Sequence, residues 1–378
     1  MIRFLTAGES HGPALTTVIE GAPSGLPLDA DGLAEELARR RLGHGRGPRM
    51  RLERDEIEIL GGVRFGRTLG GPISVIVRNT EWERWSEEMS PEEGTSRRTM
   101  TSPRPGHADL PGMLKYQTRD ARDILERASA RETAARTVAG YVSKLLLAEV
   151  GITIVSHVVQ IGDVRSNDGL PDPGDLASID ASPVRCVDQS AAEAMVDAID
   201  AAKKARDTLG GIVEVIAYEV PAGIGSHVHW DRRLDTALAA GLMSIQGIKG
   251  VEVGDGFESA SRPGSEAHDE IYPRDGVYRR ETNRAGGIEG GISNGDMIRV
   301  RAAMKPISTL MRPLATVDVT TGEVSVAFRE RSDVCAVPAA GVVAEQMVAL
   351  ALAREMQRVY GGDTVEAFVG ADNAHRRR

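Results

Sequence analysis

The sequence predicts an α+β fold built from two related halves. Two strand-like runs, 56–60 and 73–77, are joined by a glycine-rich link and suggest an antiparallel hairpin. Apolar residues recur at helical spacing along 120–150 and again after residue 338. The tetrapeptide Thr-Leu-Gly-Gly occurs at 68–71 and at 208–211, each time before an alternating strand. This short repeat fits a duplicated unit of strands and helices.

Length and composition indicate a globular chain without a membrane segment. The 378 residues, 41% of them hydrophobic, allow one large or two medium domains with a sizeable core. No stretch approaches the ~18 uninterrupted apolar residues of a membrane span, and the N-terminal run lacks the long apolar segment of a signal peptide. We therefore expect a cytoplasmic protein with no membrane partner.

Charge and cysteine usage argue against several functional classes. The net charge of -9 disfavours a general nucleic-acid binder, whose affinity depends on a basic surface. Cys186 and Cys335 are too few for a disulfide framework, and neither belongs to a Cys-x-x-Cys pair, so no metal site is expected. Six lysines leave 40 arginines among the 46 basic residues. Coding bias is one explanation of such an excess, and the binding of carboxylates and phosphates, which arginine makes bidentately, is the other.

The first candidate site follows the strand-like start 2–5. Residues 6–13 form a polar turn in which glycines flank Ser10 and His11. Glycine lets the backbone approach a ligand closely, while the two side chains supply a hydroxyl and a group that titrates near neutral pH. A tight turn with an exposed histidine is the alternative, and the motif alone does not decide between them.

Arginines gather in the next helix and loop. Asp29 or Asp31 caps a helix that ends at Gly43, and the spacing of its leucines places Arg40 on the apolar face. The loop that follows sets Arg46 and Arg49 among glycines. We expect this loop to cradle a phosphate or a carboxylate.

A rigid turn holds the second candidate histidine. Residues 82–101 are charged and poor in apolar side chains, which predicts a loop or lid. The chain then reaches 104–109, where Pro105 and Gly106 exclude a helix and fix the turn that carries Arg104 and His107.

A single long helix is predicted from Asp120 to Gly151. Its apolar stripe has Arg131 at its centre, so Arg131 is predicted to be buried. Such a guanidinium must meet a carboxylate, a group of carbonyls or an anionic ligand. Glu126 and Glu132 are not obvious partners. The small residues 128–135 leave space for a flat ligand or for close packing, and the pattern does not separate the two.

The last third of the chain contributes two more binding candidates and a tail. The glycine run 286–295 is too flexible for a strand interior and is predicted to contact a ligand. Lys305 to Thr309 place an ammonium and two hydroxyls in a proline-fixed turn, a plausible phosphate site that lacks P-loop spacing. A helix starts at Pro338 and ends at Gly361, and residues 362–378 are expected to be a frayed tail.

Together these motifs resemble the chorismate synthase family along nearly the whole chain and in the family's order. The resemblance implies a single β-α-β sandwich domain over 1–361, a homotetramer and a requirement for reduced FMN, with NADPH at most an indirect reductant. It also implies a lyase that converts 5-enolpyruvylshikimate 3-phosphate into chorismate by anti 1,4-elimination of phosphate. The alternative considered is an NADPH-dependent flavin reductase, against which the absence of a Gly-x-Gly-x-x-Gly fingerprint argues. A non-enzymatic binder of polyanions is disfavoured by the acidic net charge.

The resemblance also implies the roles of individual residues. The catalytic residues would be His11, His107 and Asp333. The substrate would be bound by Ser10, Arg40, Arg46, Arg49, Arg104, Arg131 and Arg331, although Arg40 and Arg46 could contact NADPH instead. The flavin would be bound by Arg127, Ala128, Ser129, Gln246, Gly247, Gly290, Asn294, Lys305, Pro306, Ile307, Ser308, Thr309 and Arg331. The chain departs from the family at Ala128, where serine is usual, and at Ser332, where histidine is frequent.

Overall fold

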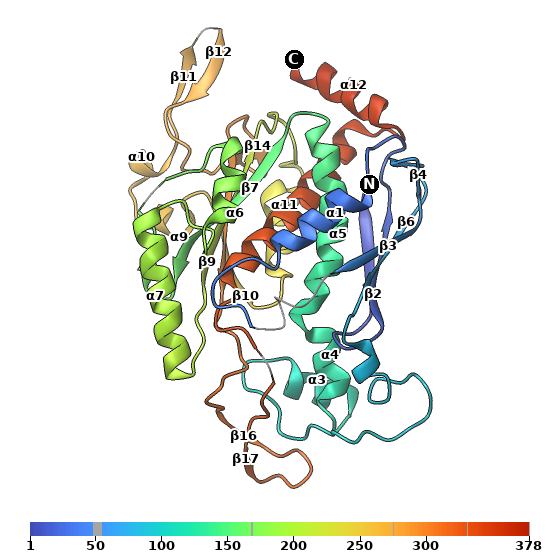
Figure 1. The fold of residues 1–378 in the computed structure, drawn as a ribbon. Helices are drawn as coiled ribbons and strands as arrows, with labels where there is room; N and C mark the ends of the chain where they lie inside the picture. Colours follow the sequence, from blue (N-terminus) through green and yellow to red (C-terminus); the bar gives the residue numbers. More distant parts are fainter. Residues whose placement is uncertain (48–54, 168, 275, 331, 378) are drawn as a thin grey trace.

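Two antiparallel sheets enclose a layer of helices in the computed structural model, which describes residues 1–47, 55–167, 169–274, 276–330 and 332–377 (Figure 1). The first sheet has the order β1 (Arg3–Ala7), β2 (Ala14–Glu20), β6 (Ile73–Arg78) and β3 (Glu56–Gly61). The second has the order β10 (Ile248–Val253), β15 (Ile298–Met304), β9 (Gly211–Tyr218), β7 (Thr153–Ile161) and β8 (Val164–Arg165). The predicted α+β class is confirmed, as is the antiparallel pairing of β3 with β6.

The helix layer consists of α1 (Ala30–Arg39), α5 (Thr133–Ala148), α8 (Leu234–Met243) and α11 (Val337–Tyr360). α5 packs against the first sheet and α11 against the second, and the two helices contact each other. α11 is long and apolar enough to cross a membrane, but 94% of its most apolar window is buried inside the protein. Its hydrophobicity is therefore that of a core helix.

The two halves share one topology. In each half the four main strands lie in the spatial order first, second, fourth, third, as counted along the chain. α1 and α8 follow the second strand of their halves, and α5 and α11 come after the fourth. The predicted duplication is correct, but the tetrapeptide that suggested it is not equivalent in the two copies. Residues 68–71 precede the fourth strand of the first half, whereas 208–211 precede the second strand of the other.

Shorter helices and two-stranded hairpins lie around this core. The remaining helices are α3 (Asp109–Tyr116), α4 (Arg122–Ala128), α6 (Leu176–Ala181), α7 (Gln189–Ala205), α9 (Gly256–Ser259), α10 (Gly264–Ala267) and α12 (Val365–Arg376), with 3₁₀ turns η1 (Trp82–Arg84), η2 (Ala130–Glu132), η3 (Pro173–Asp175) and η4 (Trp230–Arg232). The two-stranded hairpins are β4 (Val63–Arg64) with β5 (Arg67–Thr68), β11 (Ile271–Arg274) with β12 (Val277–Arg280), β13 (Ile288–Glu289) with β14 (Ile292–Ser293), and β16 (Ala315–Val317) with β17 (Val324–Val326).

The predicted helix 120–151 is interrupted at Ser129, which corrects the sequence interpretation. Ser129 has extended backbone angles (φ -64°, ψ 143°) and separates α4 from η2, which leads into α5. Its hydroxyl accepts a hydrogen bond from the backbone N–H of Arg131, as a helix N-cap does. The break turns residues 128–131 toward the adjacent cavity instead of leaving them on a continuous helix surface.

The expectation of a frayed C-terminal tail is wrong. Residues 365–376 form α12, capped by the Thr364 hydroxyl. Phe368 is fully buried and packs edge-on against Tyr360 at a centroid distance of 5.5 Å. Because the buried Phe368 side chain packs against Tyr360, the C-terminal segment folds onto the core.

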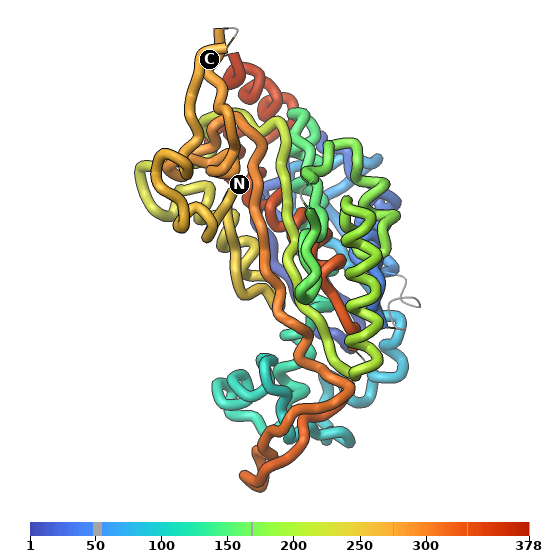
Figure 2. The backbone as a smooth tube through the Cα atoms, turned by 90° about the vertical axis from the view of Figure 1, so that its left-hand side faces the viewer, coloured from blue at the N-terminus to red at the C-terminus, as the bar shows by residue number. Residues whose placement is uncertain are grey.

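One end of the molecule is built from segments distant in sequence. The chain around α3 and α4 lies beside the β16–β17 hairpin, away from the C-terminus (Figure 2). Backbone hydrogen bonds from Val319 to Thr101 and from Phe328 to Ser102 join the two segments. This end forms one wall of the site described next.

Candidate functional site

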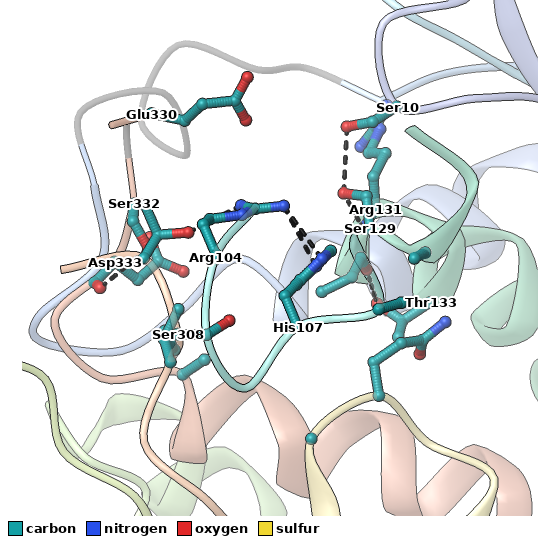
Figure 3. Close-up of a pocket in the computed structure, with 18 of the residues that line it drawn as sticks. Ser10, Arg104, His107, Ser129, Arg131, Thr133, Ser308, Glu330, Ser332 and Asp333 are labelled. Carbon is teal, nitrogen blue, oxygen red and sulfur yellow. Dashed lines mark hydrogen bonds between the residues drawn. The ribbon is translucent and has the colours of Figure 1, made fainter. Parts of the chain in front are cut away.

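A cavity of about 910 Å³ lies between four segments of the chain (Figure 3). These are the turn at residues 6–13, the break between α4 and α5, the start of α11, and residues 304–309. It contains most of the residues that the sequence singled out. Eight basic side chains line it: Arg40, Arg46, Arg98, Arg104, Arg122, Arg131, Lys305 and Arg329. Among the described residues only two acidic side chains line it, Glu330 and Asp333. The lining therefore favours a ligand with several negative charges.

His11 is fixed by Glu126. The ring Nδ1 lies 3.0 Å and 2.9 Å from the two carboxylate oxygens, and the backbone N–H of His11 donates to Oε2 at 2.9 Å. Burial acts to raise the pKa of Glu126, but hydrogen bonds from His11 and the charges of His11 and Arg122 outweigh it and lower the pKa. The carboxylate is thus ionised at neutral pH. The sequence predicted His11 as a site residue but did not identify Glu126 as its partner.

Trp85 stacks on the ring of His11. Their ring centroids are 4.1 Å apart with an interplanar angle of 30°. The guanidinium of Arg122 stands 4.9 Å from the Trp85 centroid and donates to Glu126 at 2.7 Å. Trp85 belongs to the segment predicted as a lid, but its role at the site was missed. The presence of a tryptophan in a segment otherwise poor in apolar residues could have indicated that Trp85 packs at the site.

His107 belongs to a second histidine–carboxylate pair. Its Nδ1 makes a short hydrogen bond to Asp109, the buried first residue of α3, and Arg104 Nε donates to the same carboxylate at 2.8 Å. Arg104 also reaches His107 at 3.0 Å (Figure 3). Its guanidinium donates to the Thr309 hydroxyl at 2.8 Å. Burial acts to raise the pKa of Asp109, but its hydrogen bonds with His107 and Arg104 lower it to about 2. These hydrogen bonds tie the turn to the start of α3, and its rigidity stays a prediction.

Arg131 is buried, as predicted, and its carboxylate partner is Asp55. Arg131 NH1 donates to Asp55 Oδ1 at 2.5 Å, and Nε donates to the Asn79 side chain at 3.2 Å. Arg40, also buried, approaches Asp55 to 3.9 Å and donates to the Thr133 hydroxyl at 3.5 Å. Asp55 was not among the predicted residues, because its distance in sequence from Arg131 gives no local pattern.

Asp333 is held by the arginine loop. Its Oδ2 lies 2.6 Å from Arg46 NH1, and its Oδ1 accepts the backbone N–H of Gly47 at 2.6 Å. Ser332 lines the cavity beside it. Both oxygens of Asp333 are engaged, so a proton relay through this carboxylate would require the Arg46 contact to open.

An apolar wall faces these polar groups. It is formed by Ala128, Ile245, Met304, Ala336, Ala339, Ala340 and Val343. The Ser129 hydroxyl donates to Ser10 at 3.1 Å at one end of this wall. At the other end, Gln246 donates to Glu132 at 2.9 Å, while its buried Oε1 has no hydrogen-bond partner within the described parts of the chain. Lys305, Pro306, Ile307, Ser308 and Thr309 complete the lining.

Several predicted residues do not reach the cavity. Arg127 donates to the carbonyls of Thr6 and Gly8 instead, beside β1. Gly290 and Asn294 belong to the β13–β14 region and are not among the lining residues, so the glycine run contacts no part of this site within the described chain. Much of that run serves tight backbone packing: a Cβ on Gly287 would meet the Met297 carbonyl at 2.5 Å. Arg49 and Arg331 lie outside the described residues.

Comparison with known proteins gives a consistent result. The family model described as chorismate synthase matches residues 2–357. The chorismate synthase of Frankia alni is 61% identical over 378 residues, covering 97% of this chain and 96% of the relative. That of Streptomyces avermitilis is 58% identical over 374 residues, covering 96% and 95%. A solved structure titled "Crystal Structure of Chorismate Synthase" superposes with a TM-score of 0.80 at 41% identity, covering 100% of this chain and 97% of that one.

Proposed function

Because this chain belongs to the chorismate synthase family, we propose that it converts 5-enolpyruvylshikimate 3-phosphate into chorismate and phosphate in this cavity, with reduced FMN as cofactor. The observation that carries the proposal is the cavity with eight basic and two acidic lining side chains, into which two carboxylate-paired histidines also face. The substrate has one phosphate and two carboxylates, and guanidinium groups bind such groups bidentately.

The residues present fit a flavin. The apolar wall suits the face of an isoalloxazine ring, and the unpartnered buried Oε1 of Gln246 suits a ring N–H donor. Gly247, with φ +85°, lets the chain turn beside that position. Lys305 with the Ser308 and Thr309 hydroxyls would hold the ribityl phosphate, and Ala128 would contribute only its backbone and methyl group. When bound, reduced FMN supplies transient electron donation to the substrate without net oxidation.

His11 would deliver the proton to the departing phosphate. Loss of phosphate from an allylic carbon leaves charge on the leaving oxygen, which a positioned acid relieves. With Nδ1 held by Glu126, Nε2 is the ring nitrogen that would carry that proton. Ser10, Arg40, Arg46, Arg104 and Arg131 would bind the anionic groups of the substrate, with Arg49 and Arg331 as further candidates.

His107 and Asp333 would act at the cofactor side of the cavity. His107, oriented by Asp109, would hold a proton at the edge of the flavin ring. Asp333 would relay a proton once its Arg46 contact opens. Phosphate and the substrate's carboxylates would compete with Asp333 for Arg46, so substrate binding itself would loosen this pair.

The alternative function is an NADPH-dependent flavin reductase that uses Arg40 and Arg46 to hold NADPH. An anaerobic assay with chemically reduced FMN and no NADPH separates the two. Formation of chorismate and phosphate under these conditions supports the lyase. Absence of product, together with NADPH-dependent reduction of FMN, would instead establish the reductase.

A homotetramer in the cytoplasm completes the proposal. The β16–β17 region exposes apolar side chains, including Val324 (85% exposed) and Val326 (60%), and such patches are typical of interfaces. Light scattering coupled to gel filtration tests this: a mass of one chain, 40.4 kDa, would contradict the tetramer.

A further inference from the structure

We propose that Glu126 is the positioning residue of His11: it holds one ring proton on Nδ1, so that the imidazolium form gives its second proton, on Nε2, to the leaving phosphate and returns to the neutral Nδ1–H tautomer. The proposal deepens the function proposed above and rests on it for the chemical role of His11. The tautomer itself is a property of the protein alone.

The geometry supports one orientation of the ring. The Glu126 side chain is 2% exposed and that of His11 9%. The carboxylate accepts from three donors: the His11 backbone N–H at 2.9 Å, His11 Nδ1 at 2.9 Å and Arg122 NH1 at 2.7 Å. Because an ionised carboxylate only accepts hydrogen bonds, His11 Nδ1 must carry the hydrogen.

The surroundings keep the carboxylate charged and the ring in place. Burial opposes ionisation of Glu126, but His11 and Arg122 outweigh it and lower the pKa. Arg122 is itself 3.9 Å from Glu88 and 3.9 Å from Glu330, so it is partly shared with other acids. Trp85 stacks on the imidazole at 4.1 Å, which restricts tilting of the ring.

A fixed tautomer matters because the two ring nitrogens have different roles. In catalytic triads a buried carboxylate on Nδ1 orients the imidazole and leaves Nε2 to transfer the proton. The Glu126 contact would likewise orient the His11 ring through Nδ1 and leave Nε2 to transfer the proton. Glu126 itself need not touch substrate or cofactor, and it does not line the cavity.

The substitution Glu126→Gln disturbs this arrangement without changing its shape. One carboxylate oxygen faces Arg122 and the other faces the His11 backbone N–H. The amide NH₂ of glutamine must therefore meet a donor in either orientation. It can also donate to Nδ1, which would move the ring proton to Nε2.

The chain contains a matched control pair. His157 Nε2 lies 3.0 Å from Glu214, both side chains are 2% exposed, and Arg301 donates to the same glutamate at 2.7 Å. This histidine–glutamate–arginine group lies in the second sheet and contributes nothing to the site cavity. Glu214→Gln removes an equally buried charge from beside an equally buried histidine.

Nitrogen-15 NMR of histidine-labelled full-length protein tests the tautomer without cofactor or substrate. We expect neutral His11, assigned by the loss of its signals in His11→Gln, to carry its proton on Nδ1. Glu126→Gln should shift the population toward Nε2–H, and Glu214→Gln should leave the His11 signals unchanged. A neutral wild-type His11 with its proton on Nε2 would overturn the proposal. This measurement on the wild-type protein does not depend on whether the Glu126→Gln variant folds.

Kinetics test the consequence. For Glu126→Gln we expect kcat to fall by at least about 10–100-fold, the range found for carboxylates that orient metal-binding histidines, with KM changed only a few-fold. The pH profile of kcat should also move, whereas Glu214→Gln should leave it in place. Glu126→Asp, which keeps the charge, should recover part of the loss. Equal kcat losses and unmoved pH profiles in Glu126→Gln and Glu214→Gln would overturn the proposal.

The two proposals fail in different ways. If His11→Ala keeps wild-type turnover, the acid role of His11 is wrong, yet the NMR experiment still decides whether Glu126 sets its tautomer. If His11→Ala is inactive but the tautomer is insensitive to Glu126→Gln, the acid role stands and the positioning role is wrong.

Discussion

Arg131 NH1 and Asp55 Oδ1 are 2.5 Å apart, and at least 95% of each side chain is buried. The same carboxylate lies 3.9 Å from Arg40 and 3.9 Å from Arg41. Asp55 thus bonds directly to Arg131 and lies near two further guanidinium groups, so it anchors this basic cluster at one edge of the cavity.

Asp55→Asn should destabilise the protein. The substitution removes the charge of a carboxylate that is hydrogen-bonded to the buried Arg131 guanidinium, and breaking such a buried ion pair costs about 3–5 kcal/mol of unfolding free energy. Inorganic phosphate should stabilise this variant more than the wild type, because the anion can replace the lost carboxylate. Urea unfolding with and without phosphate measures both effects. The control is Glu58→Gln, which breaks the exposed pair with Arg78 and should cost at most about 1 kcal/mol. Equal losses in the two variants would contradict the anchoring role.

The depressed pKa of Asp109 predicts a specific pH dependence. A carboxyl whose pKa falls on folding from 3.8 to about 2 contributes stability above its unfolded pKa and loses it as the pH falls toward the folded value. The difference in unfolding free energy between wild type and Asp109→Asn should be constant above about pH 4 and shrink between about pH 4 and 2. Urea unfolding across this range measures it, with a variant of exposed Asp31 as control. A pH-independent difference would refute the assignment.

His11→Ala and His107→Ala should each lower kcat by about 10²–10⁴-fold, the usual contribution of a proton-transfer group. His11 is buried against Glu126 and Trp85, so its removal should also cost stability, and kcat is compared only for variants that remain folded. Anaerobic turnover with chemically reduced FMN gives kcat, and circular dichroism checks the fold. The exposed His229, which pairs only with Asp231, provides the control substitution His229→Ala. Wild-type rates in either site variant would remove that histidine from the mechanism.

Lys305→Ala should weaken FMN binding by about 10–100-fold, because a charge-assisted hydrogen bond to phosphate contributes about 1.5–3 kcal/mol. Riboflavin, which lacks the phosphate, should lose little affinity in the same variant. Fluorescence titration measures both flavins. Lys204→Ala, which changes an exposed lysine in the last turn of α7 outside the cavity lining, is the control and should change neither affinity. An equal loss for FMN and riboflavin would place the phosphate elsewhere.

The sequence allowed prediction of those features that leave a local pattern. The burial of Arg131 follows from helical spacing, and the turn before His107 follows from its proline and glycine neighbours. The antiparallel β3–β6 pair follows from two alternating runs. The interruption at Ser129 was not predicted, because serine within an apolar stripe resembles a tolerated helix residue unless its cap role is seen.

Features that depend on tertiary pairing could not be predicted. Asp55, just before β3, meets Arg131 of η2 only because the fold brings these two segments together. Trp85 likewise meets His11 only because the 82–101 segment folds over residues 6–13. Neither contact produces a periodic pattern in the sequence. The glycine run 286–295 was misread for the opposite reason, since composition shows that a backbone is closely approached but not whether the neighbour is a ligand or another strand.

The C-terminal segment gives the last prediction. Phe368 is fully buried and holds α12 against Tyr360, so Phe368→Ala should lower the unfolding free energy by about 3–5 kcal/mol, the usual cost of emptying a buried aromatic site. Phe257, which is 79% exposed, provides the matched substitution Phe257→Ala, expected to cost less than about 0.5 kcal/mol. Urea unfolding compares the two. If the segment were a frayed tail, both variants would unfold like the wild type. Because α12 lies far from the site cavity, kcat of the folded Phe368→Ala protein should remain unchanged.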